Sequence, residues 1–314
     1  MVIGGGFKDG EQCISISRGR CSDVAELKSN HEEADTRMLL HAKHASHACT
    51  RIVIQSPDTD VLVISAATFD SLGCEELWFR TGTKDRLRLI PVHEVFRSLG
   101  EKVCSALPAC HALTGCDSIS SLAGIGKMKA WDVLCRNHVH QDTLSLLGQE
   151  HELDENTAAK SEAYICDLYP SSKRTPATTD ELRYLMFCHK RHKNEALPPT
   201  SDSVRQHIRR ANYQTYVWRR SLDAMQDLPP PKDHGWKIED GALRPVFMTK
   251  EPAPKSLLEL TTCHCKKSEC RRNCSCNNAG LSCTEACICM ADVKIHMVLP
   301  YPIAVNQMKV IRIE

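Results

Sequence analysis

The sequence lacks any long apolar segment and any marked excess of one charge. No apolar run approaches the length of a membrane span, and Met1–Phe7 has no basic segment followed by an apolar core. We therefore expect neither a membrane span nor a signal peptide. The 40 Lys and Arg residues nearly balance the 39 Asp and Glu residues, for a net charge of +1. Total charge thus indicates no partner, and only the distribution of charge can do so.

Aromatic residues make up only 5% of the chain, but 42% hydrophobic and 25% charged residues are typical of a globular protein. The 314 residues are enough for two or three domains with a sizeable core. Of the 18 cysteines, eight crowd between Cys263 and Cys289 and the others are scattered. Scattered cysteines indicate reduced thiols in an intracellular compartment, where the crowded ones favour metal over disulfides.

The segment Arg51–Ser65 contains two β-branched runs separated by the polar residues 56–60. The first run does not alternate between apolar and polar residues, which predicts a strand buried on both faces. Pro57 predicts that this strand ends near Ser56. Asp58 and Asp60 would then follow the carboxyl end of this strand, where open α/β sheets bind ligands. Two neighbouring carboxylates favour a divalent cation such as Mg²⁺ or Mn²⁺. The alternative is a capped turn, in which the Asp side chains bond to backbone N–H groups.

Residues 31–49 predict a helix with one apolar face. Glu33 and Asp35 lie in its first turn, where carboxylates also suit the positive end of the helix dipole. His41, His44 and His47 recur every three residues, which favours a solvated helix face over a metal site.

A second informative segment runs from Leu107 to Asp132. Within it, residues 124–126 form a Gly-Ile-Gly sequence before Lys127 and Lys129, which predicts a tight turn entering a helix. Backbone N–H groups and lysines at such a turn can bind a nucleic-acid phosphate. An ordinary helical hairpin would need the same glycines.

Four motifs in this order resemble the internal region of the flap-endonuclease/XPG group: Glu33–Asp35, Ser56–Asp60, Thr114–Asp117 and Gly124–Ala130. The 5′-nuclease domain of bacterial DNA polymerase I is similar, and the wider class is the PIN-like nucleases. The resemblance covers about the first 135 residues. It implies an α/β fold with a PIN-like (Rossmann-like) parallel sheet flanked by helices.

The resemblance also implies a site and a reaction. Two Mg²⁺ or Mn²⁺ ions would support phosphodiester hydrolysis and would be held by five carboxylates: Glu33, Asp35, Asp58, Asp60 and Asp117. The phosphate backbone would be contacted by Gly124, Gly126, Lys127 and Lys129.

In the family, a hydrophobic strand ending in an essential Asp precedes these motifs, and here Asp9 is the sole candidate for that residue. The sequence therefore leaves two functional classes open. One is a metal-dependent nuclease, and the other is a catalytically inactive DNA or chromatin adaptor that retains the nuclease fold. A third interpretation is a zinc-stabilised interaction protein that binds no nucleic acid.

Residues 136–228 predict a basic helical region. Between Arg183 and Arg220 there are nine Lys and Arg residues against two acidic residues. Such a region suits a polyanionic substrate, and a solvated charged face is the alternative. Proline-rich sequence predicts a linker at 229–258.

Residues 259–292 carry eight cysteines and few apolar residues: Cys263, Cys265, Cys270, Cys274, Cys276, Cys283, Cys287 and Cys289. Zn²⁺ bound by thiolates would fold such a segment, and disulfides are the alternative. The spacing resembles the CXC domain of the tesmin/TSO type and the pre-SET region of chromatin methyltransferases, which hold three zinc ions with nine cysteines.

Eight thiolates make either two Cys₄ sites or a three-zinc cluster completed by His264, His296 or water. The resemblance implies DNA binding, although Asn273 stands where the family has a DNA-contacting Tyr, and a fold-stabilising or interaction role is the alternative. Residues 293–314 form a tail. Together these features predict a nuclear protein whose partner is nucleic acid, in particular DNA, with no membrane association.

Overall fold

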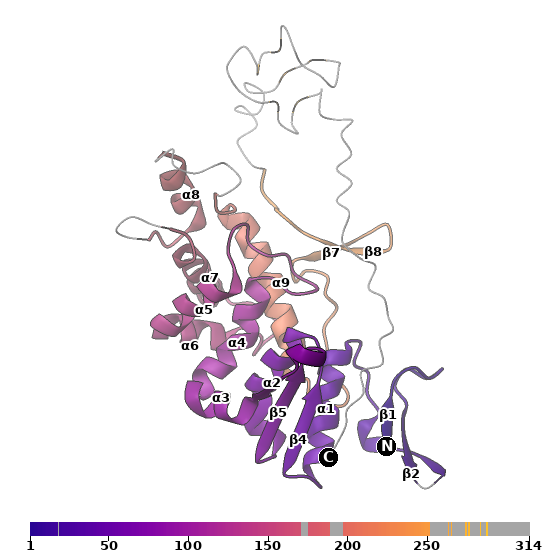
Figure 1. Cartoon of the computed structure of the whole chain (residues 1–314). Coiled ribbons are helices and arrows are strands. Elements are labelled where there is room, and N and C mark those ends of the chain that lie inside the picture. The colour runs from indigo at the N-terminus through magenta and orange to yellow at the C-terminus, as the bar shows by residue number, and fades with distance from the viewer. Residues whose placement is uncertain are drawn as a thin grey trace. The chain divides into compact units, whose positions relative to one another are not determined.

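The computed structural model describes residues 1–17, 19–170, 175–188 and 197–251 and six cysteines of the predicted module: Cys263, Cys265, Cys274, Cys276, Cys283 and Cys287. The described residues belong to two compact units, one spanning Met1–Phe247 and the other lying within Met248–Val305. Cys270, Cys289 and the predicted tail lie outside the described residues. The elements are labelled in Figure 1.

A small mixed sheet forms the centre of the first unit. Strand β4 (Arg51–Gln55) pairs in parallel with β5 (Glu76–Thr81), and β6 (Arg88–Pro91) pairs with β5 in the antiparallel direction. The predicted parallel sheet is thus limited to one pair of strands among the described residues. Ile52 and Ile54 on one face of β4 are completely buried, whereas Val53 on the other face is only partly buried, so the predicted strand forms but full burial of both faces does not.

Three helices surround this sheet. Helix α1 (Ala34–Ser46) contacts β4 and α2 (Thr59–Leu72), and α3 (Val92–Leu99) contacts β5. The helix predicted at 31–49 is therefore confirmed, but it begins later and ends earlier than predicted. Strand β4 ends before Ser56, also as predicted, and the second apolar run of the segment lies in α2.

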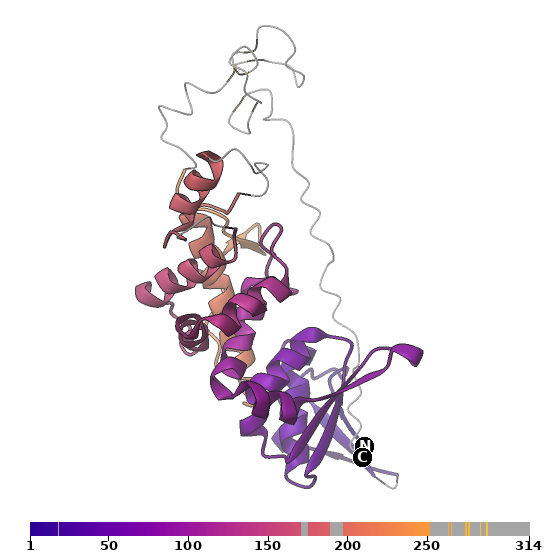
Figure 2. The same ribbon diagram turned by 60° about the vertical axis from the view of Figure 1, so that its left-hand side comes forward.

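A layer of helices adjoins the sheet, as both views in Figures 1 and 2 show. Its members are α4 (Glu101–Leu113), α5 (Lys127–Arg136), α6 (His138–Leu146), α7 (Glu155–Asp167), α8 (Thr179–Cys188) and α9 (Ser201–Arg219). One continuous hydrophobic core extends from Met38 on α1 to Trp218 on α9. Helices from both sides of the predicted boundary at residue 135 therefore share a core.

Two smaller sheets complete the first unit. Strands β1 (Val2–Gly4), β2 (Cys13–Ser17) and β3 (Arg20–Asp23) form an antiparallel sheet, in which none of them pairs with a strand of the central sheet. Strands β7 (Trp236–Glu239) and β8 (Ala242–Pro245) form a hairpin.

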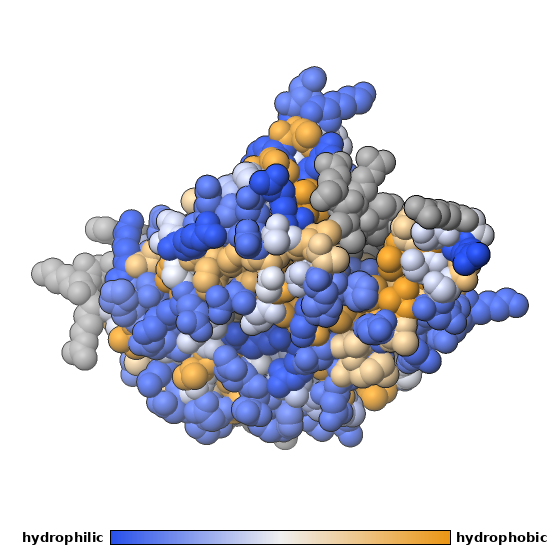
Figure 3. All heavy atoms as spheres, turned by 90° about the horizontal axis from the view of Figure 1, so that it is seen from below, coloured by the Kyte–Doolittle hydropathy of each residue, from blue (hydrophilic) through white to orange (hydrophobic). Residues whose placement is uncertain are grey.

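The surface is mainly polar where it can be seen. The face in Figure 3 is covered largely by hydrophilic side chains, with apolar ones in separate groups. Among the described residues, every helix is too short or too polar to cross a membrane.

Arg219 joins α9 to two other helices. Its guanidinium donates to the carbonyl oxygens of Leu147 and Ser145, at 2.8 Å each, and to the carbonyl and hydroxyl oxygens of Ser105, at 2.9 and 3.1 Å. Burial lowers the pKa of Arg219 to about 10, so the side chain remains charged at neutral pH. Truncation would leave several acceptors without partners.

We predict that Arg219→Ala lowers the free energy of unfolding of the full chain by about 2–4 kcal/mol. Urea unfolding followed by circular dichroism would measure this change. Arg209→Ala, a partly exposed position on the same helix, is the control and should change stability by less than about 0.5 kcal/mol. Equal effects of the two substitutions would contradict the assigned role.

Candidate active site

Three of the five predicted carboxylates come together at the carboxyl end of β4. Asp35, Asp58 and Asp60 each offer an oxygen atom, and these atoms all lie within 4.8 Å of one another. Two unit charges at about 5 Å repel by about 3 kcal/mol at an effective dielectric constant of about 20. A divalent cation would relieve this repulsion, and carboxylate oxygens are the ligands that Mg²⁺ and Mn²⁺ prefer.

Local hydrogen bonds hold the two aspartates that follow β4. The Ser56 N–H donates to the Arg80 carbonyl of β5 at 3.1 Å, and the Ser56 hydroxyl accepts from the Asp58 N–H at 3.1 Å. Asp58 is the N-cap of α2, since its Oδ1 accepts from the Asp60 N–H at 3.0 Å. The capped turn and the carboxylate cluster therefore coexist, because a cap occupies only part of the Asp58 carboxylate.

Asp60 is 8% exposed, and its Oδ1 lies 2.7 Å from Nε2 of His111 at the end of α4. The imidazole fixes the orientation of this carboxylate. Lys127 is another neighbour of Asp60: burial lowers the pKa of Lys127, and the Asp60 charge acts in the opposite direction. The acidic cluster is thus bordered by one imidazole and one ammonium group.

Glu33 is held by α9, far along the sequence. Nε2 of Gln214 donates to its two oxygens at 3.1 and 3.3 Å, and Nε1 of Trp218 donates to Oε2 at 3.3 Å. Burial raises the pKa of Glu33 to about 7, and the charges of Asp35 and Asp60 act in the same direction. Glu33 is therefore close enough to the cluster to feel its charge.

Asp117 lies in the exposed turn after α4, where Cys116 pairs with Ile119. The hydroxyl of the next residue, Ser118, donates to Oε1 of Gln214 at 2.6 Å. Gln214 thus links the turn that carries Asp117 to Glu33.

The glycine turn has the predicted form. Gly124 adopts a φ of +72°, which favours glycine, and Gly126 is the N-cap of α5. Lys129 is exposed, whereas Nζ of Lys127 donates to the carbonyls of His111 and Gly115 at 3.2 and 2.5 Å. Lys127 is therefore directed toward the acidic cluster rather than away from the protein.

Much of the predicted basic region makes internal contacts. Besides Arg219, Arg183 donates to the Pro198 carbonyl, Arg205 pairs with Glu155, Arg210 donates to the carbonyls of Gly235 and Val246, and Arg220 stacks on Tyr216. Lys190, Arg191 and Lys193 lie outside the described residues. Positive charge counted from the sequence therefore overestimates the charge that the described helices offer to a substrate.

Sequence reasoning missed His111, Gln214 and Trp218. His111 lies in an apolar helical run. Gln214 and Trp218 lie on a helix whose apolar spacing predicts a buried face, but the spacing does not indicate which residues that face contacts. Gln214 is separated from Glu33 by 181 residues. Only the packing of α9 brings them together.

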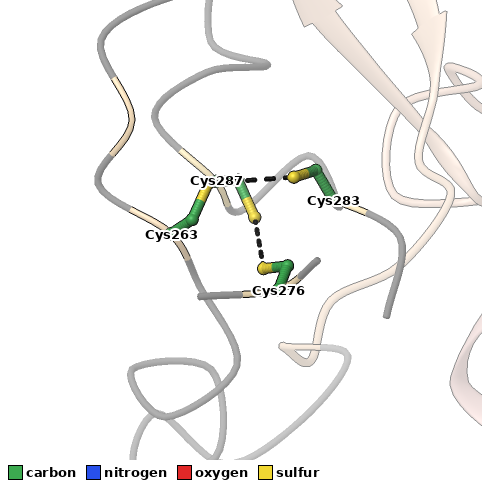
Figure 4. Close-up of side chains that lie close together, drawn as sticks. All are labelled: Cys263, Cys276, Cys283 and Cys287. Atoms are coloured by element: carbon green, nitrogen blue, oxygen red, sulfur yellow. Dashed lines mark hydrogen bonds between the residues drawn. The ribbon is translucent and has the colours of Figure 1, made fainter. Parts of the chain in front are cut away.

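The cysteines form the second candidate site, and they belong to the other unit. One group comprises Cys263, Cys276, Cys283 and Cys287, and another comprises Cys263, Cys265 and Cys274. Figure 4 shows the first group with its sulfur atoms turned toward one another. The Sγ atoms of Cys263 and Cys283 are 3.8 Å apart, and those of Cys276 and Cys287 are 3.6 Å apart.

These separations are longer than those of disulfides. A disulfide has a sulfur–sulfur length of about 2.05 Å. Four thiolates on one Zn²⁺ at about 2.3 Å have sulfur–sulfur separations of about 3.8 Å. The cysteine cluster is therefore compatible with Zn²⁺. The zinc count stays a prediction, because His264, Cys270, Cys289 and His296 lie outside the described residues.

Comparison with family models, with curated proteins and with solved structures finds no match to this chain.

The raised pKa of Glu33 predicts a pH-dependent stability in metal-free protein. The Glu33 carboxyl binds a proton more tightly in the folded state than in the unfolded state. Its protonation therefore stabilises the folded protein, and this stabilisation is fully present below pH 4.5 and is lost as the pH rises to about 7. Glu33→Gln should abolish this part of the pH dependence and should raise the free energy of unfolding at pH 8 by about 1–3 kcal/mol. Urea unfolding in EDTA between pH 4 and pH 8 would measure it.

Glu32→Gln is the matched control, because Glu32 is the exposed neighbour of Glu33. Its profile should follow that of the wild type. An unchanged profile for Glu33→Gln would show that Glu33 is ionised without cost in the folded protein.

Proposed function

We propose that the protein is a metal-dependent nuclease of the flap/5′-nuclease type, with a PIN-like first domain. The observation that carries this proposal is the convergence of Asp35, Asp58 and Asp60 at the carboxyl end of a buried parallel strand. Ligand sites of open α/β sheets lie at this end of the strands. The order of the motifs supports the same class.

In this proposal Asp35, Asp58 and Asp60 hold Mg²⁺ or Mn²⁺, with Glu33 and Asp117 beside them. Bound cations of this kind supply an activated water and neutralise charge on the leaving oxygen. The protein's own groups position the ligands: His111 orients Asp60, and Gln214 with Trp218 orients Glu33. Such positioning lowers the barrier because little reorganisation is needed during the reaction.

The proposed partner is DNA. The N-terminus of α5 and the exposed Lys129 next to it offer N–H groups and positive charge beside the acidic cluster. The cysteine module would then be a CXC-like zinc domain in a nuclear protein.

A catalytically inactive DNA or chromatin adaptor is the second candidate. Asp9, the sole candidate for the family's opening Asp, lies between β1 and β2, outside the central sheet. Its carboxylate accepts from the Glu11 N–H at 3.0 Å and lies 4.0 Å from Lys28. The adaptor would use the same DNA-contacting surface without hydrolysis.

We predict that the protein cleaves labelled flap or single-stranded DNA in the presence of Mn²⁺. Asp58→Asn/Asp60→Asn should reduce the rate at least ~100-fold, equivalent to about 2.7 kcal/mol of barrier, because the amides cannot hold the cation. Asp70→Asn, an exposed position on the same helix, should cleave at the wild-type rate. A folded wild type that binds DNA but never cuts it would establish the adaptor instead.

The salt dependence of binding tests whether Lys127 and Lys129 contact DNA. If each contacts one phosphate, Lys127→Ala/Lys129→Ala should make the slope of log K against log salt concentration shallower by about 1.8 for duplex DNA. Fluorescence anisotropy between 50 and 200 mM salt would measure the slope. Lys160→Ala, an exposed position on α7, is the control. An unchanged slope in the double variant would remove these lysines from the interface, and absence of salt-dependent binding in the wild type would favour the interaction protein without nucleic acid.

A further inference from the structure

A second cluster of metal-ligating side chains lies in the first unit, apart from the carboxylates after β4. His151 and Glu152 lie in the loop between α6 and α7, and His234 lies just before β7. Each offers one ligand atom, and the three atoms lie within 4.8 Å of one another. Two imidazoles and one carboxylate form a donor set that suits Zn²⁺.

His151 and Glu152 lie close together without a hydrogen bond between them. Nδ1 of His151 lies 3.6 Å from Oε1 of Glu152, which is too long for a hydrogen bond. This nitrogen is also buried without a hydrogen-bond partner. Two ligands on one tetrahedral Zn²⁺, each at about 2.0–2.2 Å, lie about 3.4 Å apart. The separation therefore fits two atoms that share a cation better than two atoms that share a proton.

Aromatic side chains of α9 hold both imidazoles. The rings of His151 and His234 lie 5.6 Å apart at 86°. Tyr216 contacts His151 at 5.9 Å between ring centroids, and Tyr213 contacts His234 at 5.2 Å. Because these contacts restrict the two rings, less side-chain entropy would be lost when they bind a metal.

The backbone around His234 is also specialised. Asp233 and Gly235, on either side of it, both adopt positive φ angles, of 72° and 83°. A Cβ at Gly235 would lie 2.6 Å from the Gln206 carbonyl oxygen, and Arg210 donates to the Gly235 carbonyl at 3.1 Å. Backbone held in uncommon conformations by its surroundings is often found at functional sites.

We propose that His151, Glu152 and His234 bind one Zn²⁺ ion, with water in the remaining position. The ion would connect the loop after α6 to the β7–β8 hairpin, on the side of α9 that carries Tyr213 and Tyr216. This site is independent of the carboxylate cluster and of the cysteine module, because it shares no ligand with either.

The full chain tests the proposal by its zinc content after expression in zinc-supplemented medium and removal of loosely bound metal. His151→Gln/His234→Gln should contain one zinc ion fewer per chain than the wild type. His44→Gln/His47→Gln, which removes two neighbouring imidazoles at the C-terminal end of α1, should lose none. Cobalt substitution adds a second readout: the wild-type minus variant spectrum should contain ligand-field bands without thiolate charge transfer.

Glu152→Gln is a second variant for the case in which the double variant does not fold. Its substitution should not disturb folding, since the Glu152 side chain is 82% exposed. It should fold as the wild type does and release one zinc equivalent to a competing chelator more readily. Equal zinc content in the folded wild type and double variant would overturn the proposal. If the double variant does not fold, unchanged zinc retention in Glu152→Gln would overturn it.

Discussion

Repulsion among the carboxylates at the carboxyl end of β4 is the constraint that the surrounding structure of the site has to offset. One carboxylate oxygen of each of Asp35, Asp58 and Asp60 lies within 4.8 Å of the others, and burial, together with the charges of Asp35 and Asp60, raises the pKa of Glu33. Such an arrangement persists only if surrounding groups hold the side chains in place. The imidazole of His111 and the ammonium group of Lys127 supply part of this restraint. A bound cation would supply the rest.

Helix α9 restrains the neighbouring Glu33. Gln214 and Trp218 bond to Glu33, while Arg219 fixes the end of the helix to α4 and α6. Arg210 fixes the segment around β7 and β8 to the same helix. The helix region and the sheet therefore act together, because the site depends on contacts that only their shared core can maintain. Two arginines that count as basic surface in the sequence contribute instead to this framework.

Part of the fold and of the site follows from local sequence. The apolar run of β4, the proline after it and the acidic residues beyond are enough to predict a buried strand that ends in a carboxylate pair. Glycine at 124 predicts the turn before α5, because the backbone there has a positive φ. The separation of β1–β3 from the central sheet and the contacts of Gln214 could not be predicted. They depend on packing between distant segments, which short-range periodicity does not encode.

Binding of Mn²⁺ at the carboxylate cluster is the most direct test of this account. Electron paramagnetic resonance of free Mn²⁺, titrated into zinc-loaded protein, counts the bound ions without requiring a substrate. The account predicts that wild type and Asp70→Asn bind Mn²⁺ equally and that Asp58→Asn/Asp60→Asn loses this binding while it remains folded. Equal binding by all three proteins, or no binding by the wild type, would contradict it.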